Sequence, residues 1–243
     1  MPVLDVAGVI RSQLGEPTVT ALARRFSADG TCLACADRLD AGPLAVRAYR
    51  GGDEIITLIA YHARCTASAW LDIGPAALSY EETWAAVITS VAFPAISSHT
   101  GHPGHGGPQE QVLPFMLVRP GLEVVRVRHV GPGEAVDADR EDYCRQGFID
   151  PGLFSGARRL PDIGQTWVLR NGSHLLVYVV AGDQAWSAPA DRPAHAGLIA
   201  TCQGTVVGVV FEQEPATVGA DVGVLADAIA NGDVLLGWAP LAS

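Results

Sequence analysis

The amino-acid sequence predicts an α+β protein built around a mixed β-sheet. Three observations lead to this fold class. Segments with apolar residues every three or four positions alternate with short, β-branched apolar runs. Two pairs of such runs are separated by Gly-Gly-Asp and Asn-Gly, which are typical of hairpins. The 243 residues are 49% hydrophobic and 17% charged, a balance that allows a buried core.

Two helices are predicted at the start of the chain. Residues 3–14 carry apolar side chains at spacings of three and four, which favours a short amphipathic helix. A second helix is expected from Glu16, because Pro17 suits a first helical turn and Gly30 closes the segment. A tight turn containing two cysteines follows at residues 31–35.

A β-hairpin is predicted at 44–50 and 54–61, and a helix is expected to begin near His62 and to run toward Gly74. Residues 81–93 are interpreted as a short helical turn entering a strand.

Residues 94–111 are rich in Gly and Pro, which exclude a helix or a central strand and predict a mobile loop. Its three histidines, His99, His102 and His105, are interpreted as solvated side chains more readily than as metal ligands. Two strands at 112–119 and 122–130 and a charged surface helix at 137–146 should follow. Asp139, Glu141 and Asp142 are placed on the exposed face of that helix.

The last part of the chain alternates strands and helices. Asn171-Gly172 predicts a hairpin between 166–170 and 174–181. The remaining predicted elements are a helix at 193–202, a strand at 205–211, a helix at 220–230 and a strand at 234–238. The strand, helix and strand at the end predict a C-terminal β-α-β unit with parallel strands. We therefore expect a helical and zinc-binding subdomain at residues 1–75 and an α+β domain at residues 76–243.

Charge and hydropathy limit the possible functions. The formal net charge is −10. Residues 1–70 are neutral, with seven Arg against seven acidic residues, so the remainder carries the whole deficit. An acidic surface repels phosphate backbones, which disfavours general nucleic-acid binding. The apolar runs are too short to cross a bilayer and no signal peptide is evident, so we expect a cytoplasmic protein that does not bind membranes.

Four residues have the spacing of metal ligands: Cys32, Cys35, His62 and Cys65. Five cysteines in a chain without an export signal favour metal binding over disulfides. Three thiolates and an imidazole suit tetrahedral Zn²⁺, and four protein ligands leave no open position. The pattern therefore predicts one structural zinc ion. Arg38 and Arg64 are candidates to offset the net negative charge of the site.

These residues resemble a treble-clef zinc finger over about residues 31–72. A CxxC turn, a hairpin and a ligand pair opening a helix make up that resemblance. Modules of this family serve protein contact, nucleic-acid contact or nuclease activity, so the resemblance implies a metal site without choosing among them. His62 stands where Cys is usual, and Ala36 stands where Gly is frequent.

The preferred functional hypothesis is a zinc-stabilised interaction or adaptor protein without catalytic activity, with another protein as its partner. One alternative is a hydrolase or nuclease with a site assembled from His174, Asp183 and His195. The other is nucleic-acid binding by an arginine group that must lie on one face. That group comprises Arg24, Arg25, Arg38, Arg47, Arg50 and Arg64. None of the common catalytic or nucleotide-binding motifs is present in the sequence.

Overall fold

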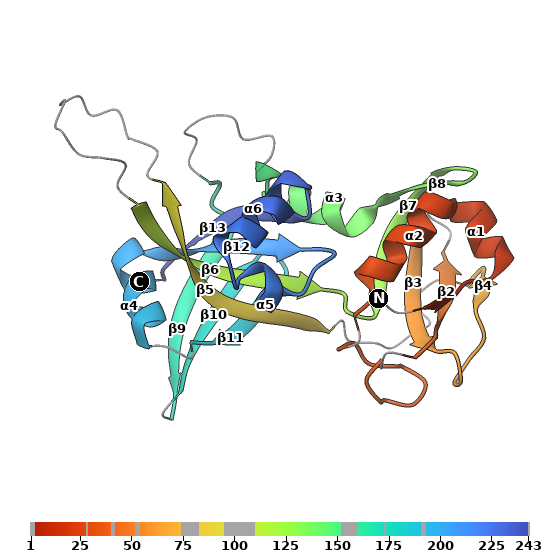
Figure 1. Ribbon diagram of the computed structural model, residues 1–243, viewed down its shortest axis with the longest axis horizontal. Helices are drawn as coiled ribbons and strands as arrows, with labels where there is room; N and C mark the ends of the chain where they lie inside the picture. The colour runs from red at the N-terminus through yellow and green to blue at the C-terminus, as the bar shows by residue number, and fades with distance from the viewer. Residues whose placement is uncertain are drawn as a thin grey trace. The chain divides into compact units, whose positions relative to one another are not determined.

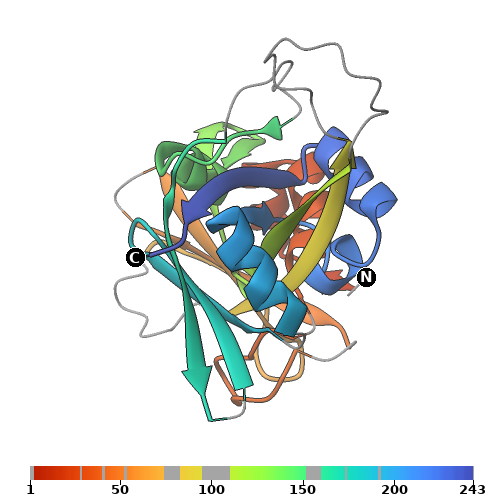
Figure 2. The ribbon, with the colours of Figure 1, turned by 90° about the vertical axis from the view of Figure 1, so that its left-hand side faces the viewer.

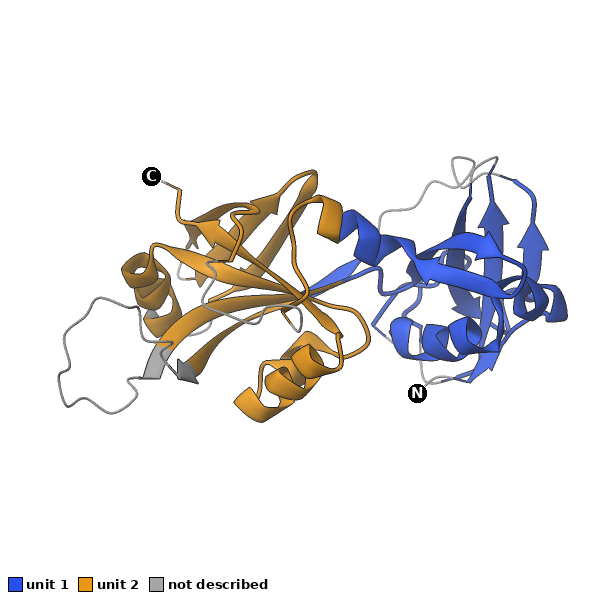
Figure 3. Cartoon of the chain, turned by 90° about the horizontal axis from the view of Figure 1, so that it is seen from above, with its two compact units in different colours: residues 1–85, 120–143 blue, residues 86–119, 144–243 orange. Residues whose placement is uncertain are grey.

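Two compact units divide the chain, and each takes residues from two separate stretches of sequence. Unit 1 consists of residues 1–85 and 120–143, and unit 2 of residues 86–119 and 144–243 (Figure 3). This division differs from the expected single boundary near residue 75, because the chain leaves unit 1, returns and leaves again. The computed structural model describes residues 3–27, 29–39, 42–51, 54–73, 83–94, 110–151, 160–172, 174–190 and 193–242.

Unit 1 is a sheet with helices (Figure 1). Its elements are β1 (Leu4–Asp5), α1 (Gly8–Leu14), α2 (Glu16–Arg25), β2 (Leu44–Arg50), β3 (Ile55–His62), β4 (Ala69–Leu71), β7 (Val124–Gly131), β8 (Glu134–Asp137) and most of α3 (Ala138–Arg145). The strand order is β1-β2-β3-β7-β8, and β4 also pairs with β2. Strands β2 and β3 form the predicted antiparallel hairpin, with Leu44 opposite His62.

The first predicted helix is shorter than expected. Leu4 and Asp5 pair in parallel with the start of β2, and the helix begins only at Gly8. The Ser68 hydroxyl explains this start, because it accepts a hydrogen bond from the Ala7 amide and donates one to the Val46 carbonyl. A side chain distant in the sequence thus fixes the end of the N-terminal strand. The helical spacing of residues 3–14 did not predict this strand.

The core of unit 1 encloses β3. Seven of the eight residues of β3 are buried. In a strand with one solvated face, buried and exposed residues would alternate. Buried apolar side chains of α1 and α2, including Ile10, Leu14 and Leu22, belong to one cluster with Leu58 and Tyr61. Cys32 belongs to the same cluster. The turn that carries the first cysteine pair is therefore part of the core packing.

An ion-pair network links α2, β7 and α3. Arg25 is buried and contacts the carboxylates of Asp137 and Asp139. Asp139 also accepts hydrogen bonds from the backbone and side chain of Arg126, and Asp142 pairs with Arg126 at 3.0 Å. The prediction that Asp139 lies on an exposed face is wrong, because its side chain is buried. A buried carboxylate needs cationic partners, and Asp139 pairs with Arg25 and Arg126.

Unit 2 contains two sheets. Its elements are most of β5 (Trp84–Pro94) and of β6 (Glu110–Pro120), then β9 (Gly164–Asn171), β10 (His174–Ala181), β11 (Gln184–Pro189), α4 (Pro193–Cys202), β12 (Gly204–Val210), α5 (Pro215–Val218), α6 (Val222–Ala230) and β13 (Val234–Pro240). The orders are β11-β10-β9 and β13-β12-β6-β5. Helix α4 packs beside β10 and β12 (Figure 2).

The C-terminal β-α-β unit has a different topology from the predicted one. β12 and β13 are neighbours and antiparallel, with Val207 opposite Gly237. The parallel partner of β12 is β6, which precedes it by more than eighty residues. The parallel prediction is wrong because α5 and α6 return the chain to the end of β12 where it left the sheet, so β13 runs back beside it.

Other local predictions are confirmed in part. β9 and β10 form the expected hairpin, and Gly172 has φ +63°, which its turn requires. Residues from Trp84 are a strand, where a helical turn had been expected. The predictions for residues 95–109, including the three histidines of that segment, lie outside the described residues. Among the helices that the structure describes, none has the length and apolar character to span a membrane.

Candidate metal centre

The first cysteine pair lies in a small closed loop between α2 and β2. Its two arms are joined by the Thr31–Arg38 bridge and by a hydrogen bond from the Cys32 amide to the Asp37 carbonyl. At the tip, the amides of Cys35 and Ala36 both donate to the Cys32 carbonyl, at 3.3 and 2.8 Å. Ala36 has φ +63°, a left-handed conformation that favours glycine. This turn directs both side chains to the same side.

The second pair lies in a turn of the same kind. His62 is the last residue of β3, and the amides of Cys65 and Thr66 donate to its carbonyl at 2.9 and 3.3 Å. The chain then enters β4, which pairs in parallel with β2. The predicted helix from His62 is therefore wrong. The treble-clef arrangement needs that helix, and in this chain two similar turns face each other instead.

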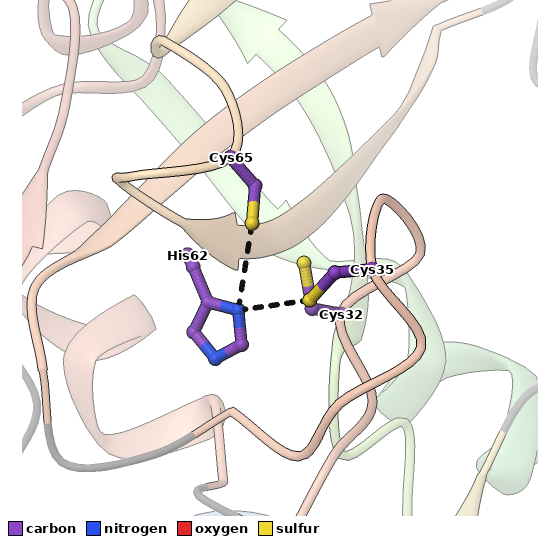
Figure 4. A group of neighbouring side chains, drawn as sticks. All are labelled: Cys32, Cys35, His62 and Cys65. Atoms are coloured by element: carbon purple, nitrogen blue, oxygen red, sulfur yellow. Dashed lines mark hydrogen bonds between the residues drawn. The ribbon is translucent and has the colours of Figure 1, made fainter.

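The four ligand atoms converge. Figure 4 shows the side chains pointing toward one another from the two turns. The Sγ atoms of Cys32, Cys35 and Cys65 and a ring nitrogen of His62 all lie within 4.8 Å of one another. The His62 Nδ1 atom is 3.3 Å from Cys35 Sγ and 3.8 Å from Cys65 Sγ. All five cysteines of the chain are free thiols, so no disulfide competes for these sulfurs.

The His62 ring is oriented for metal binding by its other nitrogen. Nε2 donates to the Arg38 carbonyl oxygen at 2.8 Å. A carbonyl only accepts, so Nε2 carries a proton, and Nδ1 is the ring nitrogen that faces the sulfurs of Cys35 and Cys65. A ring N–H held by a backbone carbonyl is the usual support for a metal-binding histidine. The sequence did not predict this role of Arg38, because a backbone carbonyl leaves no signal in residue identity.

The electrostatics of the sulfur group also favour a cation. Burial raises the pKa of the Cys32 thiol, but hydrogen bonds from the backbone at His62, Ala34 and Cys35 outweigh it and lower the pKa to about 7. At Cys35 a backbone hydrogen bond from Asp37 lowers the pKa, yet desolvation and the thiols of Cys65 and Cys32 raise it to about 11. The thiols of Cys65 and Cys32 thus oppose the ionisation of Cys35, and a cation between the sulfurs would remove that opposition.

The dimensions agree with a tetrahedral ion. With Zn–S near 2.3 Å and Zn–N near 2.0 Å, the edges of the tetrahedron are roughly 3.5–3.8 Å. Separations of up to 4.8 Å need only a small contraction to reach this size. Cys32 and His62 are buried at 0% and 2% exposure, whereas Cys35 and Cys65 are exposed. The residues present therefore fit a metal ion at the edge of the core.

The prediction that Arg38 and Arg64 offset the charge of the site is not tested by the contacts of either guanidinium with the sulfurs. Arg38 contributes its carbonyl, while its guanidinium is 3.4 Å from the Asp29 carboxylate on the surface. Arg64 is exposed. Of the larger arginine group, Arg25 is buried in ion pairs and cannot contribute to a surface.

The proposed hydrolytic residues are not brought together. His174 begins β10, and Asp183 follows the end of that strand. At about 3.3 Å per residue, an eight-residue strand separates them by more than about 20 Å. His195 lies on α4. A direct proton relay through these three residues is therefore not formed in unit 2.

Protein families, curated proteins and solved structures give no match to this chain. The assignment of a metal site therefore depends on the geometry of the four side chains.

Proposed function

We propose that Cys32, Cys35, His62 and Cys65 bind one Zn²⁺ ion with a structural role. The observation that carries the proposal is the convergence of their four ligand atoms within 4.8 Å. Three sulfurs and one imidazole are a preferred donor set for zinc, and thiolates discriminate against Mg²⁺ and Ca²⁺. Hard, oxygen-binding cations are therefore poor occupants.

A structural role follows from the ligand count. Four protein ligands complete the tetrahedron and leave no position for water or substrate. The ligands come from two turns that are close to each other only because the fold brings them there. Metal binding would therefore fix the loop at residues 30–39 against the end of β3, which is itself buried.

At the level of the whole protein, we propose a metal-stabilised interaction protein without catalytic activity, whose partner is another protein. The saturated metal site supports this role, as does the separation of His174 from Asp183. Free thiols at all five cysteines agree with a reducing, cytoplasmic compartment.

Metal binding is tested by titrating the reduced, metal-free protein with Co²⁺, whose visible absorption reports tetrahedral thiolate ligation. The proposal expects saturation at one Co²⁺ per chain and displacement by one Zn²⁺. The matched control is Cys144→Ser, which removes an exposed thiol of unit 2 and should titrate like the parent. An unchanged titration for Cys35→Ser would refute the ligand assignment.

The interaction role is tested by affinity purification from cell extract followed by native mass spectrometry. The proposal expects a stoichiometric protein complex with Cys144→Ser as bait and its loss with His62→Ala. Measurable turnover of ester, phosphodiester or peptide substrates without any stoichiometric partner would overturn it. Co-purifying nucleic acid with salt-dependent affinity would also overturn it, in favour of the arginine-based alternative.

A further inference from the structure

We infer that Cys35 and Cys65 form a peroxide-sensitive pair, whose oxidation to a disulfide releases the metal ion. The inference rests on the proposed zinc centre and adds a modification site to it. Two observations carry it: the unequal exposure of the four ligands, and the positions of these two sulfurs on separate, facing turns (Figure 4).

The exposure is divided sharply within the centre. Cys32 is fully buried and His62 is 2% exposed, whereas Cys35 and Cys65 are exposed. Zinc-bound sulfur is in its thiolate form, and oxidation of cysteine follows thiolate character together with solvent access. A small peroxide can therefore reach Cys35 and Cys65, while the fold shields Cys32.

The two exposed sulfurs are also close enough to react with each other. Cys35 Sγ and Cys65 Sγ lie within 4.8 Å of each other. A disulfide needs the sulfurs at about 2 Å, so the turns must close by less than about 3 Å. Both residues lie within the two turns described above, outside the strands.

The chemistry balances with hydrogen peroxide as the two-electron oxidant. The Cys35 thiolate attacks one peroxide oxygen, the O–O bond breaks, and Cys35 becomes a sulfenic acid while hydroxide leaves. The Cys65 thiolate then attacks the Cys35 sulfur, forming the S–S bond and expelling a second hydroxide. Two thiolates are oxidised, one peroxide is reduced to two hydroxides, and two protons from solvent convert these to water.

Oxidation leaves Cys32 and His62 as the only two ligands of the original set. Two ligands bind zinc with much lower affinity than four, so the ion dissociates. The new disulfide still joins the two turns, however. The oxidised, metal-free protein should therefore melt at a higher temperature than the reduced protein stripped by a chelator, which has no link there.

The experiment treats the zinc-loaded full-length protein with hydrogen peroxide and measures released zinc with a coloured chelator. The expected release is one zinc per chain, reversed by a dithiol and added zinc. Cys144→Ser should behave identically. Cys65→His keeps four metal ligands but cannot form the disulfide, so it should release zinc roughly tenfold more slowly.

Peptide mapping of the oxidised parent protein identifies the bond directly. Trypsin cuts after Arg25 and Arg38, leaving Cys32 and Cys35 in one peptide, and after Arg64, making Cys65 the first residue of another. A Cys35–Cys65 disulfide joins the two peptides, and fragmentation of the joined pair then places the bond on Cys35. A bond from Cys65 to Cys32, or a Cys32–Cys35 disulfide that leaves the peptides separate, overturns the inference. Zinc that stays bound under peroxide also overturns it. Protein that binds no zinc before treatment refutes the metal centre itself.

Discussion

Replacing His62 by alanine should remove the link between the two turns and destabilise unit 1. The link joins Cys35 to His62 across 28 residues. By the loop-entropy relation for cross-links, closing a loop of that length stabilises the fold by about 3.5 kcal/mol. Unit 1 contains 109 residues, 85 from the first stretch and 24 from the second. At this size we expect Tm to fall by roughly 15 °C.

The assay is thermal unfolding followed by circular dichroism, with and without EDTA. EDTA should lower the Tm of the parent protein by most of the same amount and leave His62→Ala unchanged, because that variant has no metal to lose. Cys144→Ser serves as the control and should retain both the parent Tm and the EDTA effect. If EDTA does not change the parent Tm, the loop-closure reasoning is refuted, whether or not His62→Ala folds.

Three further predictions concern stability. Arg25→Met leaves the buried Asp139 with one cationic partner fewer and should cost about 3–5 kcal/mol in urea unfolding; a loss below about 1 kcal/mol would contradict the role of the network. Ala36→Gly removes an alanine with a left-handed backbone conformation and should raise the free energy of unfolding of the zinc-loaded protein by about 1 kcal/mol. No gain in stability would show that the turn is unstrained. Burial raises the pKa of Asp233 above its usual range, so the stability linked to its protonation is present below the unfolded pKa and lost as pH rises through the folded pKa. Asp233→Asn should therefore be more stable than the parent at pH 7, and the difference in the free energy of unfolding should shrink toward pH 4. A gain that does not depend on pH would contradict the burial argument.

The parts of the fold that the sequence predicted are those determined by local chemistry. Residues near one another in the chain determine helices α2, α4 and α6 and the Asn-Gly hairpin. In α2, Pro17 in the first turn was the local signal. The convergence of Cys32, Cys35, His62 and Cys65 was predictable for a related reason. A metal site needs specific side chains, and two spaced pairs identify them even when the intervening structure is uncertain.

The errors come from long-range pairing. Residues after Cys65 are rich in Ala and favour a helix locally, but the edge of β2 pairs with residues 69–71 and makes them a strand. The two strands predicted at 112–119 and 122–130 are consecutive in the chain, yet β6 belongs to the sheet β13-β12-β6-β5 and β7 to the sheet β1-β2-β3-β7-β8. The partners of Arg25 lie 112 and 114 residues away. No local pattern distinguishes that buried arginine from a surface one.

X-ray absorption at the zinc edge of the purified protein tests the metal centre most directly. The account predicts one zinc per chain, bound by three sulfurs at about 2.3 Å and one nitrogen at about 2.0 Å. Purified, reduced protein that holds no zinc, or zinc bound only by oxygen and nitrogen, would contradict it.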